Sequence, residues 1–211
     1  MLMPRVRIQS ATTGIIPGSA YTSFMKELVR QLVHLIFGLA VAGMVLVAGQ
    51  PAAIAILAGG LFIGIVMVDL ILRGCRVPLF SGLVDAFDRG DRLPGRGALY
   101  FAVSALACVI LFPVTIAVPA LVTLAVLDSV TTIVGVRFGR TRIYNGKSWE
   151  GTIAGIIVTI LVLLPFLTLP GAVAIAIVAG VIELISPVDD NLVIPVAVCV
   201  VLALVPGFLY Q

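Results

Sequence analysis

Long apolar runs separated by short polar segments fill the chain from about residue 28 onward. A helix needs about 17–25 apolar residues to cross the roughly 30 Å hydrocarbon core of a bilayer. We expect seven such helices, at about 28–48, 51–72, 98–118, 119–136, 151–169, a short run from 171 to near 185, and 192–209. The predicted fold class is therefore all-α, a polytopic integral membrane protein with about seven transmembrane helices.

Prolines set the predicted boundaries, because a proline inside a helix removes a backbone hydrogen bond. Gln50-Pro51 separates the first two runs, which we expect to form a tight hairpin, and Pro165 kinks or ends the fifth run. The polar segment 1–26 lacks the apolar stretch of a signal peptide. We interpret 1–26 as a polar N-terminal arm and 27–211 as a single transmembrane domain.

Composition supports a membrane protein over other classes. Hydrophobic residues are 61% of the chain, charged residues 11%, and the mean hydropathy is +1.25. A soluble domain is about half apolar and a quarter charged, and disordered chains are less apolar still, so both classes are excluded. The three cysteines form an odd set without metal-ligand spacing and predict no disulfide framework. The modest basic excess forms no stripe of the kind that binds nucleic acid.

The charged residues are predicted to lie on one side of the membrane. If the seven spans alternate, all 13 basic residues fall in the N-terminal arm and in the loops after the second and fourth spans. The positive-inside rule makes that side cytoplasmic, with the N-terminus inside and the C-terminus outside. The acidic residues fall in the same half. This predicts a multi-pass cell-membrane enzyme whose active site faces the cytoplasm, rather than a receptor or channel.

Two polar positions within the predicted spans are candidates for a functional role. Glu27, Arg30, Gln31, His34 and Gly38 share one helical stripe. His34 fits equally a core histidine bonded to a neighbouring helix and a substrate contact, because polar groups inside a membrane are costly and often functional. The second position is Asp128, which lies about two turns inside its span and needs a cation or a metal as partner.

The segment from 145 to 152 opens the fifth span with a glycine, a lysine and a serine. Gly146, Lys147 and Ser148 lack the glycine that a Walker A motif needs five positions earlier, where Thr141 stands. Free amides at a helix start, with a lysine and a hydroxyl, still suit an anion. A helix cap by Ser148 and a positive-inside cluster are the simpler alternative. Basic residues nearby are Arg137, Arg140 and Arg142.

Asp189, Asp190 and Asn191 lie in a loop without basic residues, and adjacent oxygen ligands of this kind suit Mg²⁺. An N-cap of the last span, provided by Asn191 or Asp190, is the alternative, although two carboxylates plus Glu183 exceed what a cap requires. The long loop 73–97 is mixed in sign, and its end, 92–97, could supply a further phosphate contact.

Taken in order, these motifs resemble the dolichol kinase/phytol kinase family of CTP-dependent lipid kinases. The resemblance rests on Glu27-x-x-Arg30-x-x-x-His34, on Asp128 with Gly135 and Gly139, on Gly146-Lys147-Ser148-x-Glu150-Gly151, and on Asp189-Asp190-Asn191 with Pro195. Gln31 stands where the family usually has lysine, and Thr131 where a small alanine is common. The family includes CTP-dependent diacylglycerol kinases and is related to phosphatidate cytidylyltransferases.

The resemblance implies transfer of the γ-phosphoryl group of CTP to the hydroxyl of a polyprenol/dolichol-type or related isoprenoid alcohol. Asp128, Asp189 and Asp190 are then expected on Mg²⁺, and Lys147 with Arg137 or Arg140 on the phosphates. Glu150 or an aspartate would accept the alcohol proton. Arg30, His34, Gly146, Ser148 and Asn191 are the remaining expected substrate or nucleotide contacts. The expected partners are a lipid alcohol, a cytidine nucleotide and the bilayer.

Two other functions fit the same residues. A phosphatidate cytidylyltransferase-like enzyme would form a CDP-lipid and pyrophosphate, and a non-enzymatic membrane carrier would form no product. A CTP-dependent diacylglycerol kinase differs from the first proposal only in its acceptor.

Overall fold

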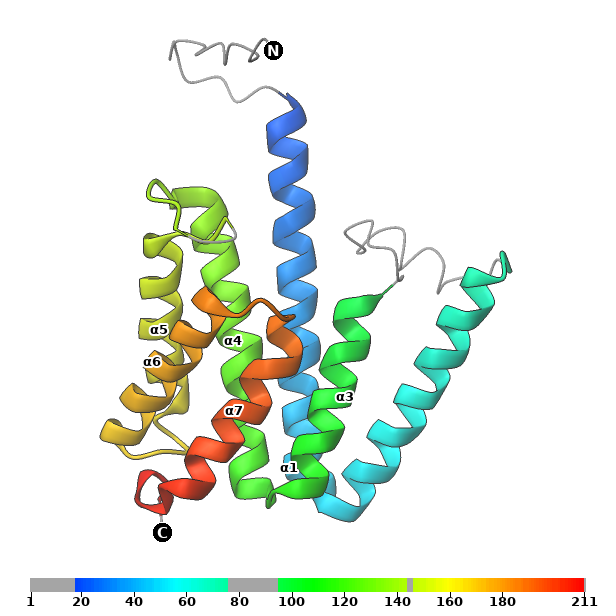
Figure 1. Ribbon diagram of the computed structural model, residues 1–211, viewed down its shortest axis with the longest axis vertical. Helices are drawn as coiled ribbons and strands as arrows, with labels where there is room; N and C mark the ends of the chain where they lie inside the picture. The colour runs from blue at the N-terminus through cyan, green and yellow to red at the C-terminus, as the bar shows by residue number, and fades with distance from the viewer. Residues whose placement is uncertain (1–17, 76–94, 144–145, 211) are drawn as a thin grey trace, which may run out of the picture.

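The computed structural model describes residues 18–75, 95–143 and 146–210, and the regular elements within them are all helical (Figure 1). The helices are α1 (Gly18–Leu72), α3 (Arg96–Leu111), α4 (Val114–Phe138), α5 (Trp149–Leu163), α6 (Leu169–Ile185) and α7 (Asp190–Leu204). A short 3-10 helix, Pro206–Phe208, follows α7. The all-α prediction is thus confirmed for the described residues.

The first helix, α1, is two limbs joined at a sharp kink. Gly49 has φ 73° and ψ 168°, a left-handed conformation that glycine adopts readily, and Pro51 follows it. The Gln50 side chain donates from Nε2 to the Val109 carbonyl oxygen of α3 over 2.8 Å, which fastens the kink to the end of that helix. The expected break between the first two runs is confirmed, with its turning point at Gly49.

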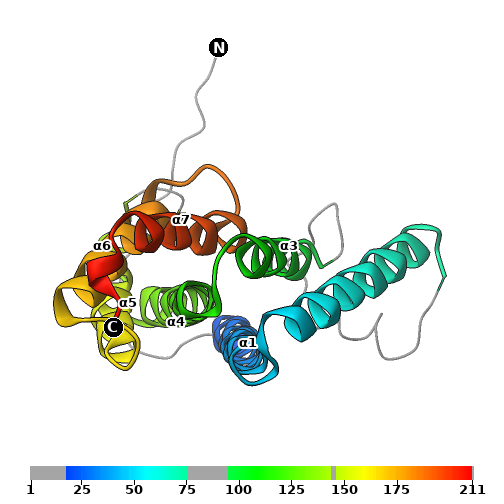
Figure 2. The same cartoon turned by 90° about the horizontal axis from the view of Figure 1, so that it is seen from below.

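The bundle has two layers (Figure 2). One layer contains the first limb of α1, then α4 and α5, and the other contains α3, α7 and α6. The second limb of α1 extends away from both layers. Helix α4 lies at the centre, where Leu121, Leu124 and Leu127 are fully buried.

Close packing joins α4 to its neighbours. A Cβ atom at Gly38 of α1 would lie 2.6 Å from the Ala125 Cβ of α4, and one at Gly155 of α5 would collide with the Thr131 side chain. Only glycine permits backbones to approach this closely. These contacts hold α1 and α5 on opposite sides of α4.

The predicted boundaries differ from the structure at three places. Helix α3 ends at Leu111 and α4 starts at Val114, so the break is at Phe112-Pro113 and Pro119 lies inside α4. Pro119 is the sixth residue of α4, past the first turn, so it leaves one backbone carbonyl of the helix without its usual donor. Helix α1 begins at Gly18, inside the expected polar arm, and α7 ends at Leu204, before the predicted 209. Helix α5 ends at Leu163, which agrees with the predicted end of this run at Pro165.

Two of the helical segments are long and apolar enough to cross a membrane, Phe24–Leu72 and Val114–Phe138. The remaining four helices, at 15–17 residues, are apolar but shorter. Membrane association is therefore indicated by length and composition, and the seven-span arrangement belongs with the proposals below. The α3, α5 and α7 starts and the α4 and α6 ends lie at one end of the bundle, opposite the C-terminus (Figure 1).

Candidate functional site

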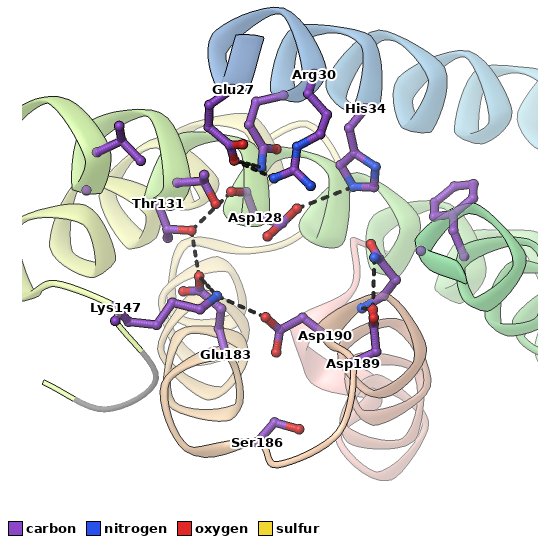
Figure 3. Close-up of a pocket in the computed structure, with 18 of the residues that line it drawn as sticks. Glu27, Arg30, His34, Asp128, Thr131, Lys147, Glu183, Ser186, Asp189 and Asp190 are labelled. Atoms are coloured by element: carbon purple, nitrogen blue, oxygen red, sulfur yellow. Dashed lines mark hydrogen bonds and ion pairs between the residues drawn. The ribbon is translucent and has the colours of Figure 1, made fainter. Parts of the chain in front are cut away.

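A cavity of about 860 Å³ lies at the end of the bundle where these helix termini gather. Its walls come from α1, α3, α4, the start of α5, and the connection from α6 to α7 (Figure 3). It contains most of the polar residues that the sequence predicted, but they divide into groups with different structural roles.

Three carboxylates from three helices meet in this cavity. They are Asp128 of α4, Glu183 of α6 and Asp190 at the start of α7 (Figure 3). One carboxylate oxygen from each lies within 4.8 Å of one from each of the others. The predicted meeting of Asp128 with Asp190 is confirmed, although more than fifty positions separate them in the chain. Glu183 takes the place that the prediction assigned to Asp189.

Lys147 connects two of these carboxylates. Its ammonium nitrogen Nζ donates to Glu183 Oε1 over 2.6 Å and to Asp190 Oδ2 over 2.9 Å. Burial by itself lowers the pKa of Lys147, but the opposing charges of Glu183 and Asp190 outweigh it and hold the pKa above its usual value. The Lys147 side chain is therefore a permanent cation in the cavity.

Glu183 is the most enclosed member of the carboxylate group. Its side chain is fully buried, and Oε1 accepts a hydrogen bond from Thr131 Oγ1 over 2.6 Å in addition to the one from Lys147. Its other oxygen, Oε2, is buried and has no hydrogen-bond partner among the described residues. A buried carboxylate oxygen without a donor is costly, and a bound cation would satisfy it.

The donor set fits a hard divalent cation. Three carboxylates face one ammonium group, so negative charge remains uncompensated unless a cation or protons enter. Mg²⁺ typically takes oxygen ligands rather than thiolate or imidazole groups. Asp128, Glu183 and Asp190 are the residues that could hold such an ion.

The polar stripe on α1 forms the opposite wall. Arg30 pairs with Glu27 on the same helix, and Gln31 Nε2 donates to Glu27 Oε1 over 3.4 Å. His34 Nε2 lies 3.6 Å from Asp128 Oδ2 (Figure 3). The stripe therefore faces the Asp128 region of α4, and the His34 ring also packs edge-on against Phe101 of α3.

Asp189 has a capping role. Its Oδ1 accepts hydrogen bonds from the Asn191 backbone amide over 3.2 Å and from Asn191 Nδ2 over 3.0 Å. Its Oδ2 lies 3.5 Å from an Arg96 guanidinium nitrogen. The alternative of an N-cap is therefore correct for α7, but the capping residue is Asp189 rather than the expected Asn191 or Asp190. Asn191 lines the cavity beside it.

The segment before α5 combines a cap with part of the cavity wall. Ser148 Oγ accepts from the Gly151 amide over 3.2 Å, as an N-cap residue does. Gly146 has φ 76°, and its carbonyl oxygen accepts from Arg142 over 2.6 Å. Gly146, Ser148 and Arg142 all line the cavity.

Three predicted site residues lie elsewhere. Arg137, Arg140 and Glu150 line a separate hollow with Phe138 and Gly139. The Arg137 guanidinium packs on the Phe24 and Phe138 rings, and Glu150 accepts from the Thr141 amide over 3.2 Å. The structure does not bring these three to the carboxylates, because they occupy the outer face of the turn between α4 and α5. Among the described residues, the arginines that line the main cavity are Arg30, Arg96 and Arg142. Of the suggested phosphate contact at 92–97, residues 92–94 lie outside the described residues, whereas Gly95, Arg96 and Gly97 line the main cavity.

Sequence reasoning gave Glu183 too little weight and did not single out Thr131. The available signal for Glu183 was a lone glutamate inside an otherwise apolar run, which has the same physical meaning as Asp128 in its own run.

Comparison with known proteins finds a relative in an archaeon. A protein of Methanocaldococcus jannaschii, named "Uncharacterized protein MJ1137", is 35% identical over 183 residues, covering 84% of this chain and 93% of that protein. The chain belongs to the same family as this protein. No family model matches the chain, and no solved structure matches it.

Proposed function

We propose that the protein is a membrane-bound, CTP-dependent lipid kinase that phosphorylates a polyprenol/dolichol-type or related isoprenoid alcohol. The observation that carries the proposal is the convergence of Asp128, Glu183 and Asp190 around Lys147 in a cavity that also has apolar walls. Phosphoryl transfer needs bound cations around the phosphates and precise positioning more than covalent chemistry. The choice of CTP and of an isoprenoid acceptor follows from the motif resemblance.

The proposed membrane arrangement has seven spans, counting the two limbs of α1 separately. The described charged residues lie toward the end that holds the cavity, and the C-terminus lies at the other end (Figure 1). Together with the positive-inside rule, this distribution supports a cavity at the cytoplasmic face, where CTP is available.

Mg²⁺ would be held by Asp128, Glu183 and Asp190, and would neutralise charge on the phosphates of the bound nucleotide. Lys147 has three ammonium hydrogens, of which two are directed to Glu183 and Asp190. The third suits a phosphate oxygen. Lys147 would thus tie the nucleotide to the carboxylate group and stabilise charge on the transferred phosphoryl group.

The proposed reaction is an in-line displacement. The acceptor hydroxyl oxygen forms a bond to the γ-phosphorus, the bond from that phosphorus to the β-γ bridging oxygen breaks, and CDP leaves with the electron pair. The hydroxyl proton passes to Asp128, whose Oδ2 lies 3.6 Å from His34 Nε2. The products are CDP and a lipid phosphate.

The deciding experiment uses purified full-length protein in lipid nanodiscs with CTP labelled either in the γ-phosphate or in the base. We expect the γ-label in a lipid phosphate and the base label in CDP, both dependent on Mg²⁺. Base label in a CDP-lipid with release of pyrophosphate would identify a cytidylyltransferase and refute the kinase. If neither product forms with any of the isoprenoid alcohols or diacylglycerols tested, the kinase is also refuted.

The two neighbouring aspartates, Asp189 and Asp190, provide a test variant and its matched control. Asp190→Asn should abolish transfer because it removes a carboxylate from the group around Lys147. Asp189→Asn should retain most transfer, because an asparagine still caps a helix. Equal losses would contradict the assignment of Asp190.

A further inference from the structure

The cavity has two chemically different ends. Lys147, Glu183 and Asp190 form the charged end, whereas Val33, Phe37, Ala98 and Phe101 line an apolar end between α1 and α3. His34 lies between the two ends, because its ring is edge-on to Phe101 and its Nε2 lies 3.6 Å from Asp128 Oδ2. A cavity that changes from charged to apolar over its length matches a molecule with a polar head and a hydrocarbon chain.

The apolar end is open to the surroundings of α1. Phe37 is 54% exposed although it lines the cavity, and it lies within the candidate membrane span Phe24–Leu72. Its ring lies 5.8 Å from the buried Phe101 ring of α3. An occupant can therefore reach the polar groups from the bilayer along this aromatic pair without crossing the charged end.

Below this opening the cavity is closed. A Cβ atom at Gly38 would lie 2.6 Å from the Ala125 Cβ, so α1 and α4 are in direct contact one residue past Phe37. The Phe101 ring borders the same contact, 3.9 Å from the same Cβ position. A chain entering beside Phe37 is thus directed outward between α1 and α3.

His34 has an unused polar atom at the boundary between the two ends. Its Nε2 is buried and has no hydrogen-bond partner among the described residues, because Asp128 Oδ2 at 3.6 Å is beyond hydrogen-bond distance. The His34 ring is held edge-on to Phe101, with centroids 6.0 Å apart. A slight opening of the pair would place a hydroxyl oxygen at about 2.8 Å from both Nε2 and Oδ2.

We propose that His34 and Asp128 bind the hydroxyl of the acceptor lipid between them, while its hydrocarbon chain leaves the cavity over Phe37 and Phe101 into the bilayer. This inference rests on the proposed kinase function and assigns its acceptor subsite. The hydroxyl donates to Asp128 and is oriented by His34, which positions its oxygen toward the charged end.

The test separates binding of the alcohol from its phosphorylation. Full-length protein in phosphatidylcholine nanodiscs is labelled with a long-chain isoprenoid alcohol carrying a diazirine in the first isoprene unit next to the hydroxyl, and the labelled peptides are mapped. We expect labelling on α1 and α3 next to Phe37 and Phe101, with competition by the unmodified alcohol. The same chain without a hydroxyl should compete at least tenfold less well, which corresponds to loss of one good hydrogen bond.

Two variants sharpen the result. His34→Asn should raise the KM for the alcohol about tenfold and leave the KM for CTP unchanged, whereas a purely structural role would change both. Phe37→Ala should reduce labelling, and Phe62→Ala should not, because Phe62 is equally apolar and 69% exposed but lies outside the cavity.

The outcomes distinguish the two proposals. Hydroxyl-dependent labelling at α1 and α3 without any lipid phosphate would support the alcohol subsite and refute the kinase. Lipid phosphate formation with labelling elsewhere, or with Phe37→Ala and Phe62→Ala equally labelled, would refute the subsite and leave the kinase standing. Unchanged alcohol KM in His34→Asn would refute the role of His34.

Discussion

Lys147 and Glu183 are joined by a hydrogen bond of 2.6 Å, although 36 positions separate them in the chain. This contact links the segment before α5 to the last turns of α6, and Asp190 extends it to the start of α7. The cluster therefore forms only when three separate helices have assembled, and its charges depend on each other.

The first prediction concerns Lys147. Lys147→Ala should lower turnover by about 100-fold or more, because no other group replaces the cation at the transferred phosphate. Arg140→Ala removes an equal charge outside the cavity and should leave turnover nearly unchanged. The measurement is labelled-CTP turnover per folded protein, judged by elution from a sizing column. Near-normal turnover in Lys147→Ala would leave this residue with a structural role only.

The second prediction concerns the shared cation. Asp128→Asn and Asp190→Asn should each abolish transfer and weaken Mg²⁺-dependent nucleotide binding. The double variant should bind nucleotide about as weakly as either single variant, because groups that hold one ion act as a unit. Isothermal titration with and without Mg²⁺ measures this. Additive losses, or nucleotide binding that is insensitive to Mg²⁺, would contradict a shared site.

The third prediction uses stability as the readout. Mg²⁺ binding to the folded state should raise the melting temperature of the protein, since a ligand that binds only the folded form stabilises it. Glu183→Gln keeps an oxygen that can accept from Thr131 but lacks the charge, so this Mg²⁺-dependent shift should disappear. Asp189→Asn should retain the shift. A normal shift in Glu183→Gln would exclude Glu183 from the cation site.

The fourth prediction concerns helix packing. Gly155→Leu should reduce the free energy of unfolding by about 1–3 kcal/mol, because the new side chain would collide with Thr131 and Leu127 of α4. Gly60→Leu is the matched control, since nothing lies within 4 Å of the new Cβ atom there. Thermal stability in detergent checks both. Equal stability of the two variants would contradict the close contact between α4 and α5.

The fifth prediction concerns orientation in the membrane. In a Cys75→Ser background, Arg140→Cys should react with an impermeant thiol reagent only from the cytoplasmic side, and Gly207→Cys only from the outer side. These positions are exposed and lie at opposite ends of the bundle. Labelling of Arg140→Cys from outside would contradict the proposed access of CTP.

Several features could be predicted from the sequence because they depend on interactions between residues that are close in the chain. The apolar runs predict helices, because a buried or membrane helix needs a continuous apolar length, and Gly49 to Pro51 marks a turn wherever the chain folds. Asp128 stood out for a similar reason, since a carboxylate inside an apolar run requires a partner. None of these inferences depends on which helices are neighbours.

Only the tertiary structure determined which of two adjacent aspartates joins the cluster. Asp189 and Asp190 are chemically identical in the sequence, but the helix start turns Asp189 onto the backbone amide of Asn191 and Asp190 toward Lys147. In the same way, Lys147 and Glu150 lie on one short segment, yet the turn between α4 and α5 directs Lys147 inward and Glu150 toward Thr141. The physical reason is that side-chain direction near a helix terminus depends on capping and on neighbouring helices, and Glu183 becomes part of the site only because α6 packs beside α5 and α7.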